Sequence, residues 1–258
     1  MTVKTLSREY EEKLFELMNQ DRIRHFWGIY DTQHMKEQVQ TWIAISKGKI
    51  SGYLMEIDKR ILHVRGSAEC ATRLLESTDL PRPLFNIEPS HLSGVESLYE
   101  HFRPTDATSK GEVTTYFSMK VNANDFKPVK LVNIREIGKE DVEAVGNLLC
   151  REPDRVKDLL KELSYGLYEH GQLAAFAAAP EILEDLAIIR GVYTKPNLRR
   201  KGYATSVCSA VVSRLIEQGK EAILYVSKEN QPALGVYKKL GFNETGHVFL
   251  SFHAEKKS

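Results

Sequence analysis

The chain has 258 residues, of which 28% are charged and 42% hydrophobic, as is typical of a globular protein with one large domain or two small ones. Its net charge of +1 excludes an overall attraction to nucleic acid or to an anionic membrane, and its three scattered cysteines argue against a disulfide framework or a zinc site. The charged amino terminus has no apolar core and no apolar run approaches the ~20 residues that span a bilayer, so we expect a cytoplasmic protein without a membrane partner.

The first half of the chain alternates between helical and strand patterns. Apolar residues at helical spacing from Leu6 to Met18 predict a first helix, whereas the aromatic stretch 21–31 fits neither pattern. Runs of β-branched and aromatic residues between turns predict strands at 41–46, 50–57, 61–66, 83–88 and 112–121. Two further helices are predicted, at 67–78 and 90–102.

Residues 122–130 are polar and contain a proline, which predicts a linker. The second half then repeats much of the order of the first. Its predicted strands lie at 131–137, 165–170, 172–180, 184–194, 221–227 and 246–253, and its predicted helices at 139–149, 154–163, 201–219 and 231–241. The shared order indicates a duplicated α+β unit whose halves share little residue identity, with a chance match of short patterns as the alternative.

A basic turn, "NLRRKGYATSV" at 197–207, lies between a strand end and a helix start. Apolar residues recur every three or four positions after Gly202 and predict that helix. The first turn of a helix has N–H groups without intrahelical partners and partial positive charge, and a glycine lets an anion approach the backbone closely. Ala204 keeps the next turn low and Thr205 adds a hydroxyl, so the turn fits a phosphate or pyrophosphate.

Three cations precede this glycine, and Arg199, Arg200 and Lys201 could screen the remaining charge of a bound anion. Neither G-x-x-x-x-G-K-[ST] nor a G-x-G-x-x-G after a strand is present, which excludes two known phosphate loops. On this segment alone, a solvated basic loop in front of a surface helix is an equally good interpretation.

The stretch "RRKGYA", residues 199–204, is similar to the R/Q-x-x-G-x-G/A signature of the GNAT superfamily of acyl-CoA N-acyltransferases, and "GVYTKP" precedes it as a strand end with a proline does in that family. The resemblance implies that the turn binds the pyrophosphate of coenzyme A, largely through backbone N–H groups. The residues implied at the pyrophosphate are Arg199, Arg200, Lys201, Gly202, Tyr203, Ala204 and Thr205. Those implied to pair their backbone with the pantetheine arm are Val192, Tyr193 and Thr194.

A second stretch, "NQPALGVYKKLGF" at 230–242, resembles the N-x-x-A-x-x-x-Y-x-x-x-G-F motif of the same family. The resemblance implies that Asn230 contacts coenzyme A and that Tyr237 stands near the thioester sulfur. Helical spacing alone favours a core aromatic residue at Tyr237, with its hydroxyl satisfied. Because both motifs occur in the family's order and spacing, we expect Tyr237 to be catalytic.

The resemblance covers roughly residues 130–255 and implies an α+β fold of two tandem GNAT-like domains, each with a mixed, mostly antiparallel central sheet flanked by helices. We expect a degenerate GNAT-like domain at 1–125 and an acetyltransferase domain with the acyl-CoA site at 126–258. The first domain has only "VRGSAEC" at the equivalent turn, so we expect no coenzyme there. It would complete the sheet or form part of the acceptor cleft. The tandem arrangement is similar to a subgroup related to glycine N-acyltransferases.

The implied reaction is transfer of an acetyl group from acetyl-CoA to a small-molecule or peptide amine by direct attack, without a metal ion. A backbone N–H at the end of the "RGVYT" strand would stabilise the oxyanion, and Tyr237 would protonate the leaving thiolate. The general base is not identified, because Tyr225 stands where some relatives have a glutamate. Glu184, Asp185 and His170 are candidates by sequence proximity, with a water chain as the alternative.

Other functions stay open at this point. The chain could be a non-catalytic acyl-CoA-binding sensor or interaction module, or an N-acyltransferase that uses longer acyl-CoA donors. A duplicated fold could act as a monomer with an internal pseudo-dimer or as a homodimer. The spacing of the histidines matches no metal-ligand pattern.

Overall fold

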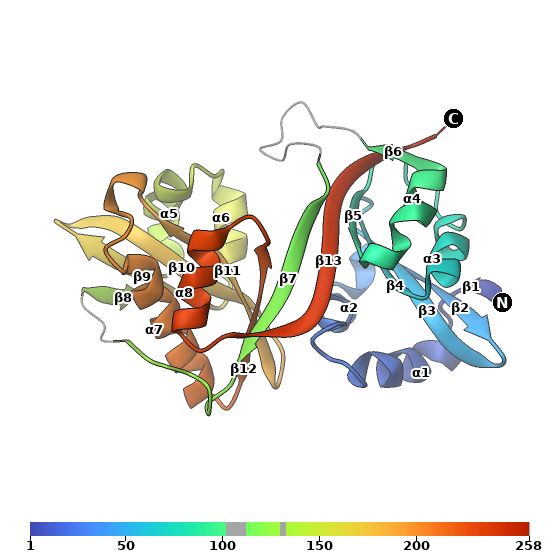
Figure 1. Ribbon diagram of the computed structural model, residues 1–258, viewed down its shortest axis with the longest axis horizontal. Helices are drawn as coiled ribbons and strands as arrows, with labels where there is room; N and C mark the ends of the chain where they lie inside the picture. The colour runs from blue at the N-terminus through green and yellow to red at the C-terminus, as the bar shows by residue number, and fades with distance from the viewer. Residues whose placement is uncertain (102–111, 130–132, 258) are drawn as a thin grey trace. The chain divides into compact units, whose positions relative to one another are not determined.

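The computed structural model describes residues 1–101, 112–129 and 133–257. The chain forms two compact units, whose elements are labelled in Figure 1. Unit 1 comprises Met1–Phe117 together with His247–Ser258, and unit 2 comprises Ser118–Gly246. The end of the predicted linker and the start of the next predicted strand, at 130–132, lie outside the described residues.

Unit 1 contains a mixed, mostly antiparallel sheet in the order β1-β2-β3-β4-β5-β13, in which β4 and β5 pair in parallel. The strands are β1 Thr2–Thr5, β2 Val39–Ser46, β3 Lys49–Ile57, β4 Ile61–Gly66, β5 Leu84–Ile87, β6 Tyr99–His101 and β13 Asn243–Lys256, which starts in unit 2. The helices are α1 Arg8–Asn19, α2 Phe26–His34, α3 Ala68–Leu75 and α4 Leu92–Leu98, with 3-10 turns η1 Lys36–Gln38 and η2 Pro89–His91.

The core of unit 1 lies between its sheet and helices α3 and α4. Leu54 and Phe85 are fully buried there, together with Leu74 of α3. Phe252 of β13 joins the same cluster and stacks on Phe85 at 5.3 Å between ring centroids. The closing strand therefore supplies side chains that the core of unit 1 needs.

Two elements of unit 1 were not predicted, and one prediction was wrong at its end. The strand β1 and the helix α2 occur where no element was assigned. The helix predicted at 90–102 stops at Leu98, and Tyr99–His101 form the strand β6 instead. The reason is long-range pairing, because β6 pairs with β13 in the register His101↔Ala254, which no local pattern records.

Unit 2 also contains a mixed, mostly antiparallel sheet, in the order β7-β12-β11-β10-β9-β8, with β11 and β12 parallel. The strands are β7 Thr114–Val121, which enters the unit at Ser118, β8 Ile134–Glu136, β9 Leu163–Glu169, β10 Gln172–Ile182, β11 Leu186–Thr194 and β12 Glu221–Ser227. The helices are α5 Val142–Leu149, α6 Pro153–Leu159, α7 Tyr203–Glu217 and α8 Gln231–Lys239, with 3-10 turns η3 Lys139–Asp141 and η4 Pro196–Leu198.

Helices α5 and α6 cover one face of this sheet, where Val145, Val156 and Leu159 pack against Phe176 and Ala178 of β10. Helix α7 forms because small and apolar residues recur along it, and it packs along β9, β10 and β11 (Figure 1). The predicted α+β class, with mixed, mostly antiparallel sheets flanked by helices, is confirmed in both units.

The compact units do not follow the sequence as two consecutive segments. The strand β13 enters unit 1 at His247, and its pairing with β5 includes Leu250↔Ile87 and Phe252↔Phe85. The domain predicted from the sequence at 126–258 contains all of β13. Among the helices of the described residues, none is both long enough and apolar enough to cross a bilayer.

Candidate active site

The centre of unit 2 is the place where two parallel strands part. β11 and β12 are paired through Leu186↔Glu221, Ala187↔Ala222 and Ile188↔Ile223. Both strands continue beyond these pairs, β11 to Thr194 and β12 to Ser227, and within the described part of the chain their pairing ends at Ile188 and Ile223. Backbone groups on this edge of β11 are therefore available to an extended ligand that enters between the strands.

Beyond the last of these pairs, β11 contains a β-bulge. Phe176 of β10 pairs with Tyr193 and Ala178 with Arg190, so that Gly191 and Val192 oppose a single residue of β10. Gly191 has φ +66°, and a Cβ on it would lie 3.2 Å from Phe176 Cε1 and 3.3 Å from Leu159 Cδ1. A bulge bends its strand and re-aims the backbone, and here only glycine fits it without strain.

Gly191 is a residue that the sequence analysis missed. The signal was available, because an isolated glycine in a run of β-branched residues is typical of a bulge or of close backbone approach. Val192 and Tyr193, whose backbone was predicted to pair with the pantetheine arm, are half-buried, Val192 in the bulge and Tyr193 after it. Thr194 is 8% exposed, and its Oγ1 is buried without a hydrogen-bond partner.

The turn after β11 leaves the start of helix α7 without a side-chain cap. Gly202 is the N-cap residue with φ +84° and no neighbour within 4 Å of an added Cβ. The first intrahelical bond runs from Ser206 N–H to the Gly202 carbonyl at 3.0 Å, and in the described part of the chain the N–H groups of Tyr203, Ala204 and Thr205 donate to no protein acceptor. The predicted uncapped amides are thus present at the predicted glycine.

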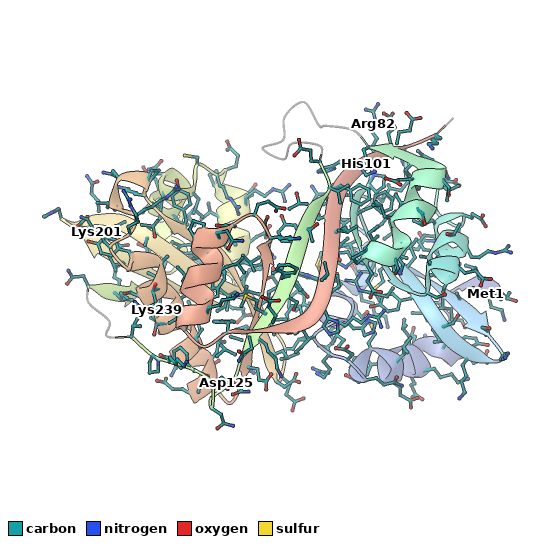
Figure 2. All side chains as sticks on the ribbon, in the orientation of Figure 1. Met1, Arg82, His101, Asp125, Lys201 and Lys239 are labelled. Atoms are coloured by element: carbon teal, nitrogen blue, oxygen red, sulfur yellow. The ribbon has the colours of Figure 1, made fainter. Side chains whose placement is uncertain are left out.

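The cations of the turn differ in what they contact. Arg199 donates from Nε to the Thr194 carbonyl at 3.3 Å and lies 5.8 Å from the centroid of the Tyr193 ring, which folds the turn back on β11. Lys201, at the periphery of unit 2 in Figure 2, forms an ion pair with Glu169 at 3.1 Å. Glu169 also accepts from the Tyr203 hydroxyl at 2.6 Å.

Hydrogen bonds from Tyr203 and Lys201 hold the pKa of Glu169 below its usual range. This carboxylate was not anticipated from the sequence, because it lies on β9, more than thirty positions before its two partners. Lys201 is thus already neutralised. Arg200 is exposed, and no ion pair involves it in the described residues.

Helix α8 brings Asn230 and Tyr237 into the unit. Asn230 is its exposed N-cap residue, and its Oδ1 accepts from Ala233 N–H at 3.2 Å. This capping role leaves the amide Nδ2 of Asn230 as the group that could reach a ligand. Pro232, in the first turn of the helix, fits the same helix start.

Tyr237 packs against the helix that follows the basic turn. Its ring lies 5.7 Å from that of Phe242, and it interacts with Cys208, which is fully buried on α7. Tyr237 is 7% exposed and makes no hydrogen bond with the described residues. Its Oη is nevertheless not fully buried. The hydroxyl therefore has some access to solvent, while burial raises its pKa and keeps it protonated at neutral pH.

The three candidate bases from the sequence do not converge on this region. Glu184 and Asp185 are exposed in the turn between β10 and β11, and His170 is exposed in the turn between β9 and β10. A different carboxylate, Glu181 of β10, is buried next to the bulged strand. Glu181 was not predicted as a site residue, because neither burial nor cross-strand register can be read from a single acidic residue.

Comparisons with known proteins agree with this arrangement. Residues 164–250 match the family described as FR47-like protein. A crystal structure of a Drosophila protein is similar with a TM-score of 0.70 at 14% identity, covering 97% of this chain and 98% of that one. An acetyltransferase of the GNAT family from Colwellia psychrerythraea gives a TM-score of 0.61 at 14% identity, with 98% and 99% coverage.

A tandem GNAT protein from the clavulanic acid biosynthesis pathway is also similar, with a TM-score of 0.53 at 12% identity over 84% of this chain and 82% of that one. The chain has the tandem GNAT fold. The match to the FR47-like family lies within residues 164–250, which include the bulge, the basic turn and helix α8 of this GNAT fold. A search of curated proteins found no match.

Proposed function

We propose that the chain is an N-acetyltransferase that moves an acetyl group from acetyl-CoA to an amine by direct attack. The observation that carries this proposal is the parted pair β11/β12 followed by the uncapped start of α7. A strand edge with unpaired backbone groups suits the pantetheine amides, and free N–H groups at a helix start suit a pyrophosphate. The FR47-like match over the same residues supports it.

In this proposal the donor lies along β11 and ends at α7. The backbone of Val192, Tyr193 and Thr194 would pair with the pantetheine arm. The N–H groups from Gly202 to Thr205 would hold the pyrophosphate, because open space around Gly202 allows close approach. Arg200 is the cation left to balance its charge, since Arg199 and Lys201 have protein partners.

The chemistry would use the bulge and Tyr237. The amine attacks the thioester carbonyl, and a backbone N–H of the bulge at Gly191 and Val192 stabilises the oxyanion. Tyr237 donates its proton to the leaving thiolate, for which a raised pKa keeps the proton available near neutral pH. Holding the amine and the thioester together supplies a further part of the acceleration.

The acceptor is proposed as a small-molecule or peptide amine, and the cytoplasm as its location. The relationship to glycine N-acyltransferases, the degenerate role of the first half, the absence of a metal ion and the oligomeric state stay predictions. A sensor without turnover and an enzyme for longer acyl chains are the two outcomes that the following experiment separates from acetyl transfer.

The experiment combines donor binding with turnover. Calorimetry with acetyl-CoA and thiol release with a panel of amino acids, polyamines and peptides are measured for the wild type and for Tyr237→Phe. We expect Tyr237→Phe to keep donor affinity and to lose about 10²-fold in rate, the usual scale of a general acid. Tyr165→Phe, on half-buried Tyr165 of β9, is the matched control and keeps its rate.

Tight acetyl-CoA binding without turnover on any amine would favour a non-catalytic acyl-CoA sensor over an acetyltransferase. Faster transfer with benzoyl-CoA or longer acyl-CoA than with acetyl-CoA would show that the preferred donor is not acetyl-CoA. A wild type that binds no acyl-CoA would overturn the proposed function as a whole.

A further inference from the structure

Glu181 is a carboxylate at the point where the strands of unit 2 part. It lies on β10 opposite Ile188, which is also the last residue of β11 that pairs with β12. The residue is 9% exposed. A carboxylate at this depth is rare unless its oxygens are hydrogen-bonded, so its contacts decide what it does.

The two oxygens of Glu181 differ. Oε1 accepts from Arg190 Nη1 at 2.5 Å, whereas Oε2 is buried and has no hydrogen-bond partner. Asp141, also buried in unit 2, shows what a purely structural carboxylate looks like. Arg135 donates to both of its oxygens, at 2.6 and 3.0 Å, and the Gly138 N–H donates to Oδ2 at 3.1 Å.

An unsatisfied carboxylate oxygen in a buried position costs free energy, and such groups collect at functional sites. Glu181 is held at Oε1 by Arg190, whereas Oε2 is enclosed by protein without a hydrogen-bond partner. The partner that would satisfy Oε2 is a donor with positive charge, such as an ammonium group.

Glu181 lies on the face of the sheet that α5 and α6 cover, because it interacts with Asp158 of α6 and with Lys161 just beyond it. Its ion-pair partner Arg190 is paired with Ala178, which belongs to the core cluster under α5 and α6. Leu159, the last residue of α6, packs against Gly191 of the bulge. The carboxylate and the backbone proposed to hold the oxyanion therefore lie beneath the end of the same helix.

We propose that Glu181 is the general base of the reaction, whose Oε2 binds the acceptor ammonium and takes one of its protons. This rests on the proposed function. It identifies the acceptor as an amine that arrives protonated, which includes amino acids, alkylamines and peptide amino groups. Arg190 is then a positioning residue, which fixes the carboxylate through Oε1 and leaves Oε2 for the substrate.

The proton balance of the step is complete. One ammonium proton moves to Glu181 Oε2 and later to solvent, and the freed nitrogen lone pair forms the C–N bond. The carbonyl electron pair shifts to oxygen and returns as the C–S bond breaks, and the sulfur leaves with the bonding pair. Tyr237 gives the sulfur its proton and regains one from the nitrogen, so the product amide keeps the third.

The pH dependence follows from the groups around Glu181. Burial raises its pKa, while Arg190 of β11 and Lys161, just beyond α6, lower it and Asp158 of α6 raises it. The base acts only when it is deprotonated. The rate should therefore fall as the pH falls through the pKa of Glu181, and this limb should lie above the ordinary range of a glutamate.

The test compares Glu181→Gln with the wild type on two probe amines and acetyl-CoA. Propylamine is protonated at neutral pH and needs a base, whereas hydroxylamine is largely neutral. We expect Glu181→Gln to lose about 10²-fold in kcat/KM with propylamine at pH 7, to lose much less with hydroxylamine, and to recover as the pH approaches the pKa of the amine. Glu184→Gln, which alters a nearby exposed glutamate, should keep both the rate and the acid limb.

Folding and donor binding are checked by thermal unfolding and by calorimetry with acetyl-CoA, and Glu181→Asp provides a second variant that keeps the charge but shortens the reach. Equal rates and equal acid limbs in a folded Glu181→Gln would overturn the role of Glu181 and leave the proposed function standing. Loss of the limb in Glu184→Gln would overturn it in favour of Glu184. A wild type that releases no thiol with either probe or with the amine panel would overturn both.

Discussion

Both units contain two parallel strands that part after three paired positions, but the residues that follow make different contacts in each unit. In unit 1 the parallel strands β4 and β5 pair through Ile61↔Leu84, Leu62↔Phe85 and His63↔Asn86, just as β11 and β12 pair through three positions in unit 2. In each unit an arginine and a glycine with positive φ soon follow the last pair, Arg65-Gly66 and Arg190-Gly191.

The arginines then turn toward different neighbours. Arg65, 3% exposed, donates to the Asn86 carbonyl at 3.1 Å and to its Oδ1 at 2.9 Å, so it bridges β4 and β5 where their pairing ends. Arg190 instead pairs with Glu181 on β10, the strand on the other side of β11. Arg65 joins the two strands that part, whereas Arg190 forms an ion pair with the strand on the other side of β11.

The connections to the next helix differ as well. In unit 1, Ser67 follows Gly66 directly and caps α3, and its Oγ accepts from Cys70 N–H at 3.3 Å. In unit 2, the chain continues from Gly191 through η4 before α7 starts at an uncapped Gly202. A helix start whose N–H groups are already satisfied offers nothing to an anion, so of these two helix starts only that of α7 suits the proposed pyrophosphate.

The largest expected effect concerns the uncapped turn. Gly202→Glu should weaken acetyl-CoA binding by at least about 100-fold, because a side chain at φ +84° strains the turn and its carboxylate repels the diphosphate. Calorimetry measures the affinity. Gly219→Glu, at the other end of α7 with φ +75° and equally open space, is the control. Unchanged affinity in Gly202→Glu would remove the pyrophosphate from this turn.

The second prediction concerns Arg65, which joins β4 and β5 of unit 1 where their pairing ends. Arg65→Leu should lower the free energy of unfolding by about 2–3 kcal/mol, because the buried Val64 carbonyl and the partly buried Asn86 carbonyl each lose a donor. Acetyl-CoA affinity should stay unchanged. Denaturant unfolding measures the first quantity, and exposed Arg60→Leu should change it by less than about 1 kcal/mol. A loss of acetyl-CoA affinity would show that unit 1 shares in donor binding.

A third difference is the presence of buried histidines in unit 1. Burial lowers the pKa of His25 to about 4 and that of His63 to about 3. The unfolded chain takes up protons below its own histidine pKa, whereas the folded chain resists them, so stability is full above about pH 6.5 and is lost as the pH falls below it.

Each of these histidines should cost about 1.4 kcal/mol of stability at about pH 5.5 relative to neutral pH. Thermal unfolding between pH 7 and pH 5.5 measures the loss. His63→Leu should remove its share of the slope. A melting temperature that is flat over this range would contradict the assignment.

The smallest expected effect concerns Glu169, which neutralises Lys201 beside the turn. In Glu169→Gln the amide oxygen can still accept from Tyr203, so the turn keeps its geometry while one negative charge disappears. We expect acetyl-CoA to bind about threefold more tightly at low salt, with the gain disappearing at high salt. Glu217→Gln, at the far end of α7, should show no gain; weaker binding in Glu169→Gln would mean that the ion pair itself shapes the turn.

Much of unit 2 could be predicted because its signals are local. The apolar period of α7, the glycine before it and the proline that opens α8 each depend on neighbours in sequence. What was missed depends on distant neighbours. Glu181 matters through burial and through its register with Ile188, and Lys201 is neutralised by a residue on another strand.

The same limit explains the errors in unit 1. The helix α2 carries Phe26 and Ile29, both buried, in an aromatic stretch whose period is too short to separate helix from strand. Tyr99–His101 became a strand only because β13 lies beside it. Neither the pairing nor the burial can be read from these segments alone.

Because most of β13 belongs to unit 1, the two units cannot finish folding in the order in which their first residues are synthesised. A chain made from its amino end completes Ser118–Gly246 before His247–Ser258 exists. Until then unit 1 lacks Leu250 and Phe252, which pair with β5 and fill its core. Met1–Phe117 therefore leave the ribosome before Ser118–Gly246 but belong to the unit that finishes folding later. An interrupted synthesis would leave the open edge of β5 exposed to aggregation.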